Sequence, residues 1–128
     1  MENRTDALIA ELDAFMAEYD KRTNAHDVNR WRELVADDAT YWFTDGSFEG
    51  IDAIADAVQR TFDEIQDEVY TISDLHWVGA SADCAVVRYR FHWVGYTNGQ
   101  RREGQGRGTN AMIKENGRWQ MIHEHLSA

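Results

Sequence analysis

Two histidines, His123 and His125, are separated by one residue near the end of the chain, in the segment "GRWQMIHEHLSA". If this segment is a strand, both side chains point to the same side of it. Histidine has an ordinary pKa of about 6.5, so a pair at a pocket wall could act as general acid and base or donate hydrogen bonds to a ligand. A structural role, in which both rings bond to backbone and carboxylate groups near a subunit interface, is also compatible with this spacing.

A metal site is a third interpretation of these histidines, because His76 or His92 could supply a further ligand to zinc. The HEH spacing is not the H-E-x-x-H spacing of metalloproteases, so we expect no metal. The segment "GQGRG" at 104–108 lacks the lysine and the following helix of a phosphate-binding loop. It is expected to begin a strand.

Three helices are predicted in the first half of the chain from apolar residues at helical spacing. The first covers 5–22, the second is expected to begin at Asn24 as its N-cap, and the third follows Gly50. Between the second and the third, "ADDATYWFTDG" is expected to form a short aromatic strand that ends in a turn at Asp45-Gly46.

From residue 69 the apolar pattern changes to a period of two, which predicts four further strands. They are expected at 68–79, 84–96, 106–115 and 118–127, with hairpin turns at Asn98-Gly99 and Asn116-Gly117. Helices segregated to one face of a curved antiparallel sheet define an α+β fold class.

The strand at 84–96 has two chemically different faces, and its apolar face should meet the helices. That face carries Ala85, Val87, Tyr89, Phe91 and Trp93. The other face carries Val86, Arg88, Arg90, His92 and Val94, a composition that is compatible with a subunit interface.

The size and charge of the chain limit its partners. We expect the 128 residues to form a single domain, 1–128. The formal net charge of -10 disfavours nucleic-acid and acidic membrane partners, and we expect neither a nucleic acid nor a membrane. The lone cysteine, Cys84, excludes an internal disulfide and is expected in the core, which fits a cytoplasmic location.

Two long segments, "ADDATYWFTDGSFEGIDAIADAV" and "GRGTNAMIKENGRWQMIHEHLS", resemble the nuclear transport factor two-like, or SnoaL-like, superfamily. The resemblance covers nearly the whole chain. It implies a cone-shaped α+β barrel, in which a curved sheet wraps around three helices and encloses a pocket, and a homodimer that is built through the sheet. The superfamily includes ketosteroid isomerase, scytalone dehydratase, polyketide cyclases and limonene epoxide hydrolase, together with non-catalytic kinase association domains, so the fold alone does not fix a function.

The resemblance also suggests candidate site residues. Tyr19 lies where ketosteroid isomerases place the tyrosine that stabilises an oxyanion, but Phe43 occupies the place of their catalytic aspartate. The Tyr-Asp pair and the strand tyrosine of scytalone dehydratase resemble Tyr19, Asp20 and Tyr41. One pocket arginine of the kinase association domains corresponds to Asn110.

The sequence therefore favours a protein that binds a small apolar or aromatic molecule in its cone. If the protein is an enzyme, we expect cofactor-free acid/base chemistry of the isomerase, dehydratase or cyclase type. The alternative is a non-catalytic dimeric module that binds a ligand or a partner. The candidate catalytic residues are Tyr19, Asp20, His123 and His125. The candidate ligand-binding residues are Tyr41, Trp42, Tyr89, Phe91, Trp93 and Asn110.

Overall fold

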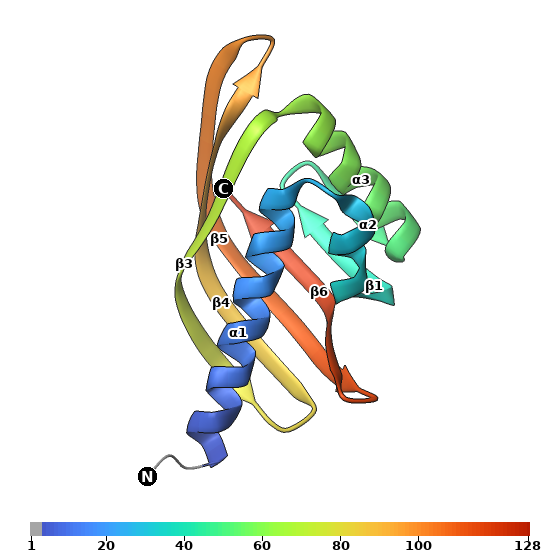
Figure 1. The fold of residues 1–128 in the computed structure, drawn as a ribbon, viewed down its shortest axis with the longest axis vertical. Coiled ribbons are helices and arrows are strands. Elements are labelled where there is room, and N and C mark those ends of the chain that lie inside the picture. Colours follow the sequence, from blue (N-terminus) through green and yellow to red (C-terminus); the bar gives the residue numbers. More distant parts are fainter. Residues whose placement is uncertain (1–3) are drawn as a thin grey trace.

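Apart from one additional short strand before the third helix, the helices and strands follow the expected order in the computed structural model, which describes residues 4–128. The helical elements are α1 (Arg4–Ala25), α2 (Val28–Trp31) with a 3-10 turn at Arg32–Leu34, and α3 (Ile51–Glu64). The strands are β1 (Val35–Phe43), β2 (Gly46–Glu49), β3 (Gln66–Ala80), β4 (Cys84–Thr97), β5 (Gln100–Glu115) and β6 (Arg118–Ser127). This arrangement confirms the α+β class with three helices in the first half (Figure 1).

The six strands form one curved, unclosed sheet in the order β2-β1-β6-β5-β4-β3 (Figure 1). The four long strands are antiparallel, as expected, but β1 pairs with β6 in parallel. β6 lies between β5 and β1 in the sheet. Its hairpin with β5 requires β6 to run antiparallel to β5, and in this direction β6 runs the same way as β1. The turn at Asp45-Gly46 does not lead directly into α3, because β2 first pairs back along β1.

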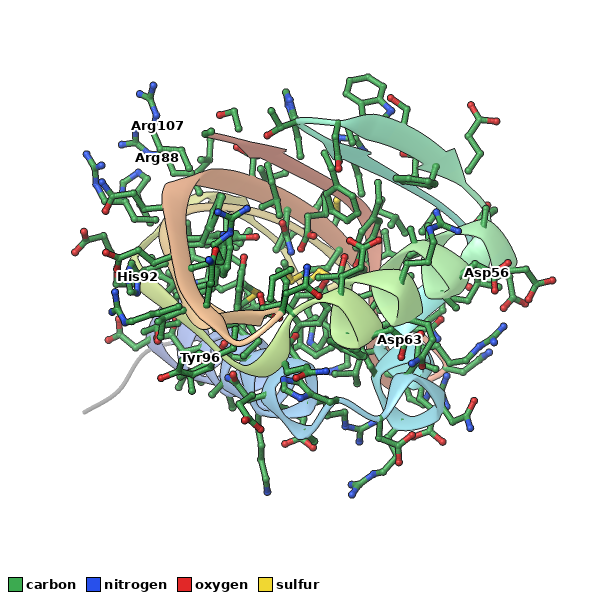
Figure 2. The ribbon with its side chains drawn as sticks, turned by 90° about the horizontal axis from the view of Figure 1, so that it is seen from above. Asp56, Asp63, Arg88, His92, Tyr96 and Arg107 are labelled. Atoms are coloured by element: carbon green, nitrogen blue, oxygen red, sulfur yellow. The ribbon has the colours of Figure 1, made fainter. Side chains whose placement is uncertain are left out.

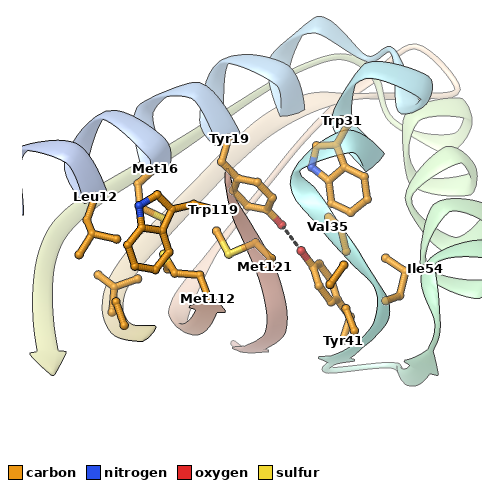
Figure 3. Close-up of a cluster of buried hydrophobic side chains, with 14 of the residues drawn as sticks. Leu12, Met16, Tyr19, Trp31, Val35, Tyr41, Ile54, Met112, Trp119 and Met121 are labelled. Atoms are coloured by element: carbon orange, nitrogen blue, oxygen red, sulfur yellow. Dashed lines mark hydrogen bonds between the residues drawn. The ribbon is translucent and has the colours of Figure 1, made fainter. Parts of the chain in front are cut away.

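The helices lie across one face of the sheet and enclose a single apolar cluster. Leu12, Met16 and Tyr19 of α1 pack toward Met112 on β5 and Met121 on β6 (Figure 3). Trp31 of α2, Ile54 of α3 and Tyr41 of β1 extend this cluster toward the other end of the sheet. Among residues 4–128 no helix is long and apolar enough to cross a lipid bilayer.

The predicted alternation of faces on β4 is confirmed. Ala85, Val87 and Tyr89 are buried against the helices, while Arg88 and His92 point outward from the far side of the sheet (Figure 2). Cys84 is exposed, so its expected place in the core is wrong. The same alternation explains this, because Cys84 precedes the inward-facing Ala85 and therefore points outward.

The second helix is capped by Asp27 and not by Asn24. The Asp27 carboxylate accepts a bond from the Asn29 backbone nitrogen at 3.1 Å. Asn24 remains in the last turn of α1, where its side chain accepts from the nitrogen of Tyr70 and donates to its oxygen, both at 2.7 Å. This pair of bonds fixes the end of α1 against β3.

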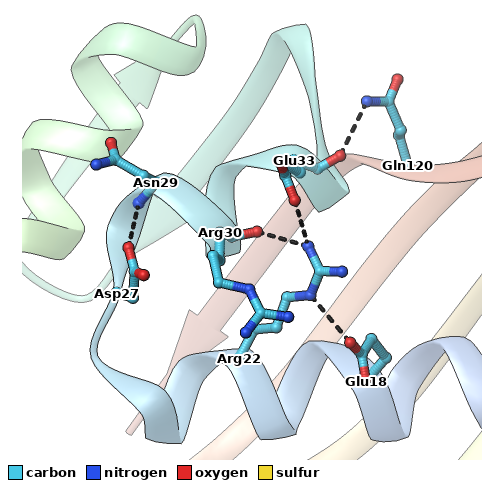
Figure 4. Close-up of polar contacts among 7 residues, drawn as sticks. All are labelled: Glu18, Arg22, Asp27, Asn29, Arg30, Glu33 and Gln120. Atoms are coloured by element: carbon cyan, nitrogen blue, oxygen red, sulfur yellow. Dashed lines mark hydrogen bonds and ion pairs between the residues drawn. The ribbon is translucent and has the colours of Figure 1, made fainter.

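A polar network holds the corner between α1 and α2 (Figure 4). The Arg22 guanidinium donates to Glu18 at 3.0 Å, to the Arg30 backbone oxygen at 2.7 Å and to Glu33 at 2.9 Å. The Gln120 amide of β6 donates to the Glu33 backbone oxygen at 3.2 Å. These contacts set the positions of Tyr19 and Trp31, which flank the corner and contact each other with ring centroids 5.8 Å apart.

The glycines of "GQGRG" lie under aromatic side chains. Across the β4–β5 ladder, Trp93 pairs with Gly104, Phe91 with Gly106 and Tyr89 with Gly108. A Cβ atom on Gly104 would lie 2.5 Å from Trp93 Nε1, and one on Gly106 would lie 2.7 Å from Phe91 Cζ. The segment is therefore part of β5, and its glycines let large aromatic rings cover the inner face of the sheet.

Gly106→Ala should lower the free energy of unfolding by about 1–3 kcal/mol, because the new methyl group overlaps both the Phe91 ring and the backbone oxygen of Ser127. Gly79→Ala is the matched control, since nothing lies within 4 Å of a Cβ there. Urea unfolding measures both variants. Equal stability of the two variants would contradict this packing.

Candidate functional site

A cavity of about 430 Å³ opens between the helices and the inner face of the sheet. Most of its wall is apolar, and its carboxyl groups belong to Asp45, Glu68 and Glu124. The remaining lining residues are Tyr19, Thr23, Trp31, Phe43, Thr44, Val58, Thr61, Phe62, Ile65, Tyr70, Phe91, Trp93 and Leu126. The exposed side chains of Thr44, Asp45 and Thr61 mark its mouth. A concave apolar site of this size with few polar groups suits a small molecule.

Glu124 is the hydrogen-bonded centre of this cavity. Its Oε1 atom accepts from the Tyr19 hydroxyl at 2.9 Å and from the Asn110 amide at 3.1 Å. The Tyr89 hydroxyl lies 3.4 Å from the same oxygen and donates to Asn110 Oδ1 at 2.9 Å. The Tyr41 hydroxyl lies 2.7 Å from that of Tyr19 (Figure 3). Since Tyr19 donates to Glu124, Tyr41 must donate to Tyr19.

The donors around Glu124 are all neutral. Burial, followed by the negative charge of Glu124, raises the pKa of Tyr19, Tyr41 and Tyr89 far above the ordinary value, so these hydroxyls keep their protons and donate. Burial also raises the pKa of Glu124 to about 6, although its bonds from Tyr19, Asn110 and Tyr89 lower it. The carboxyl group therefore changes charge close to neutral pH.

The second carboxylate oxygen of Glu124 faces the cavity. Every hydrogen bond to this side chain ends on Oε1. Within residues 4–128 no fully buried side-chain nitrogen or oxygen lacks a partner, so the unbonded Oε2 must have accessible surface. Because Glu124 lines the cavity, that surface opens into it. An anchored carboxylate with one free oxygen is suited to accept a proton from a bound molecule.

A bulge in β6 turns Glu124 inward. Met112 on β5 pairs with Met121, but its neighbour Ala111 pairs with His123, so Ile122 is an extra residue in β6. Inward-facing residues up to Met121 have odd numbers, and after the bulge the inward positions are even. One inserted residue therefore exchanges the two faces for the rest of the strand.

The same bulge places His123 and His125 on the outer face, so their expected position at the pocket wall is wrong. Trp42 packs edge-on against both rings, with centroids 4.9 Å and 5.7 Å away. The Thr40 hydroxyl is 2.8 Å from His123 Nδ1. Trp42 is 48% exposed on this outer face and does not form a pocket wall as expected, because it pairs with His125 across the β1–β6 ladder.

Asp20 lies apart from Glu124. It borders a separate, smaller depression with Asp13, Met16, Ala17, Ile72 and Leu75. Burial raises the pKa of Asp20 to about 6. Tyr19 and Asp20 are neighbours on α1, but Tyr19 lines the larger cavity and Asp20 borders the smaller depression. These two side chains therefore do not act on the same ligand.

The other predicted site residues lie in or behind the cavity wall. Tyr19, Phe91 and Trp93 line the cavity. Tyr41, Tyr89 and Asn110 are buried behind this wall, where they hold the hydroxyl and carboxyl groups of Tyr19 and Glu124.

Two carboxyl groups of the cavity, Glu124 and Glu68, were not among the predicted site residues. Glu68 could have been found, because it shares a face of its strand with the apolar Tyr70 and Ile72. Glu124 could not be found by simple alternation, since the bulge reverses the face. Within residues 4–128 no group of three His, Cys, Asp or Glu side chains is arranged to hold a metal ion.

The sequence profile of the SnoaL-like domain matches residues 12–128, and the chain belongs to this family. No protein with a curated description matches the chain in sequence.

Solved structures share the fold at low sequence identity. A nuclear transport factor 2-like superfamily protein of Salmonella enterica is 17% identical, with a TM-score of 0.87 over 97% of this chain and 92% of its own. A proposed scytalone dehydratase of Novosphingobium aromaticivorans is 17% identical, with a TM-score of 0.81 over 95% and 86%. A proposed calcium/calmodulin-dependent protein kinase II association domain of Xanthomonas campestris is 18% identical, with a TM-score of 0.83 over 99% and 89%. The expected cystatin-like, nuclear transport factor 2-like fold is thereby confirmed.

Glu124→Gln should stabilise the protein at pH 8 by about 2 kcal/mol and leave it unchanged near pH 4. The folded-state pKa of about 6 lies above the ordinary 4.5. The carboxyl group therefore stabilises the fold fully below about pH 4.5, and this contribution is lost as the pH rises through about 6. Glutamine keeps the accepting oxygen and cannot ionise.

Denaturant unfolding at several pH values measures this difference, with the exposed Glu49→Gln as the matched control. A pH-independent difference between Glu124→Gln and the native protein would contradict the raised pKa.

Proposed function

We propose that this protein binds a small, largely apolar molecule in the cavity and moves a proton on it without a cofactor. The observation that carries the proposal is Glu124, a buried carboxyl group with Oε1 held by Tyr19 and Asn110 and with Oε2 open to the cavity. Its pKa of about 6 allows it both to take and to return a proton near neutral pH.

In this proposal the ionised Glu124 acts as the general base. Oε2 takes a proton from a C–H or O–H group of the substrate, and the bonding electron pair stays on the substrate. The protonated carboxyl then returns the proton to a different atom, which completes an isomerisation, or protonates a departing hydroxyl group, which completes a dehydration. The hydrogen bonds to Oε1 hold the carboxyl plane fixed through both steps.

Tyr19 is a positioning residue in this scheme. Its proton is directed at Glu124 and its oxygen faces the Tyr41 hydroxyl, so it is not free to polarise a substrate carbonyl while this network is intact. This role differs from that of the oxyanion tyrosine which the resemblance to ketosteroid isomerase implied for Tyr19. The kinship with a proposed scytalone dehydratase supports the reaction class only through the shared fold.

A test of binding comes first. A library of small neutral aromatic compounds, screened by ligand-observed NMR, should contain compounds that bind the native protein. Binding should be lost in Thr61→Trp, because this substitution places an indole at the cavity mouth. Binding should be kept in the control Asp56→Trp, because Asp56 lies on the solvent side of the same helix (Figure 2). Equal binding to both variants would place the ligand elsewhere.

Catalysis is tested on the compounds that bind, beginning with enolisable ketones in D₂O. The native protein and Glu49→Gln should exchange a substrate hydrogen for deuterium, and Glu124→Gln should lose at least about a hundredfold of this rate, the usual contribution of general-base catalysis. The rate should rise with pH through an apparent pKa of about 6, as Glu124 ionises. Bound compounds that never exchange would favour the alternative function, a non-catalytic ligand-binding module.

We further propose that two copies associate through the outer face of the sheet. This face exposes Trp42 at 48% on β1 and, three strands away on β4, Arg88 and Arg90. Exposed aromatic and arginine side chains are enriched at the centres of interfaces. Light scattering at micromolar concentration should give a dimer for the native protein and a monomer for Trp42→Glu. A native monomer would contradict the proposal.

A further inference from the structure

Glu68 is a buried carboxyl group that the proposed proton transfer does not use. The residue is only 7% exposed and lines the cavity, yet within residues 4–128 no hydrogen bond or ion pair involves its carboxylate. Since no fully buried side-chain oxygen within residues 4–128 lacks a partner, the Glu68 oxygens have accessible surface. They face the cavity, and burial raises the pKa of this group to about 7.

The backbone holds Glu68 in this position. Gln66 pairs with Tyr96 and Val69 with Val94, so β3 bulges where Glu68 lies, and Asp67 takes a left-handed φ of 53°. The His26 ring bonds the Glu68 backbone oxygen at 2.9 Å. A Cβ atom on Gly95 would lie 3.2 Å from the Glu68 Cα atom, so the glycine permits the close approach of β4. The backbone of β3 therefore determines that this carboxyl group points inward.

Among the residues that the structure describes, those that line the cavity supply negative charge and aromatic surface but no cationic side chain. Asp45, Glu68 and Glu124 line it, and none of its lining residues is lysine, arginine or histidine. The aromatic side chains in its wall are Tyr19, Trp31, Phe43, Phe62, Tyr70, Phe91 and Trp93. Tyr70 and Phe91 stack at 5.9 Å with an interplanar angle of 15°, which forms a flat wall on β3 and β4 beside the bulge that carries Glu68. Aromatic faces attract cations, and a cation would stabilise the ionised form of a buried carboxyl group that has no other partner.

We propose that the ligand of this cavity is an apolar or aromatic molecule that carries one positively charged nitrogen, and that this nitrogen pairs with Glu68. This inference rests on the proposed function and names the class of its substrate. The charged group lies against the aromatic wall and the carboxylate, and the apolar body fills the rest of the cavity toward Glu124. A ligand that carries a carboxylate or phosphate is excluded, because it would meet three acidic side chains and no donor cation.

Three probes test the proposal: phenyltrimethylammonium, its neutral isostere tert-butylbenzene, and 4-tert-butylbenzoate, which adds a para-carboxylate to the neutral probe. Binding is followed by tryptophan fluorescence, since Trp31 and Trp93 line the cavity. At pH 8 the cation should bind about tenfold or more tightly than its neutral isostere, and the anion should not bind. This ratio should fall at least about threefold in Glu68→Gln and stay unchanged in Glu64→Gln, an exposed glutamate at the end of α3.

The ratio should also fall between pH 8 and pH 5, as Glu68 and Glu124 gain protons. The titratable side chains around Glu68 are Tyr19 on α1, Asp45 in the β1–β2 turn, Tyr70 on β3 and Glu124 on β6, with His26 against the Glu68 backbone. Comparison with Glu124→Gln separates the two carboxyl groups, because only the loss of Glu68 should remove most of the cation preference.

The outcomes separate the two proposals. Equal affinity for the cation and the neutral isostere would overturn the ligand class and leave the binding function in place. An unchanged ratio in Glu68→Gln would overturn the assignment of Glu68. If neither probe bound, and the neutral library also gave no ligand that Thr61→Trp excludes, the proposed function itself would fail.

Discussion

The extra residue Ile122 in β6 decides which chemistry faces the interior of this protein. Without it, the alternation that buries Trp119 and Met121 would continue to His123 and His125, and Glu124 would be exposed to solvent. With it, a carboxyl group enters the cavity, and both imidazoles pack around Trp42 on the opposite face. This backbone irregularity therefore adds a carboxyl group to the cavity and two imidazoles to the outer face.

Once Glu124 is inside, much of the surrounding structure serves to accommodate it. Two donors bind Oε1 of the carboxyl group, namely the hydroxyl of Tyr19 from α1 and the amide of Asn110 from β5. The hydroxyl of Tyr89 from β4 in turn donates to the Asn110 side chain. None of these donors is charged. They hold the carboxylate in place, but ionisation of Glu124 inside the protein still costs more free energy than in water, and burial therefore raises its pKa to about 6. A cationic side chain in the same place would have fixed the charge permanently and ended any exchange of protons near neutral pH.

Local patterns in the sequence predicted the elements well and predicted the inner faces where the strands are regular. Alternation placed Tyr89, Phe91 and Trp93 on the inner face of β4, and the glycines opposite them explain why "GQGRG" belongs to a strand. The predictions that failed depend on long-range contacts. Asn24 bonds to a strand 46 residues away instead of capping α2, and β6 takes its bulge from pairing with β5 and β1. No glycine or proline marks that bulge, so the inward carboxyl group could not be found from spacing alone.

The most direct test of this account is the titration of Glu124 itself, followed by NMR of the side-chain carboxyl carbon in protein labelled with ¹³C-glutamate. Glu124→Gln identifies the resonance, and Glu49 serves as an exposed reference in the same spectrum. We expect a midpoint near pH 6 for Glu124, well above that of an ordinary glutamate. A midpoint at or below 4.5 would mean that the carboxyl group is solvated or paired with a cation, and the proposed proton transfer would lose its physical basis.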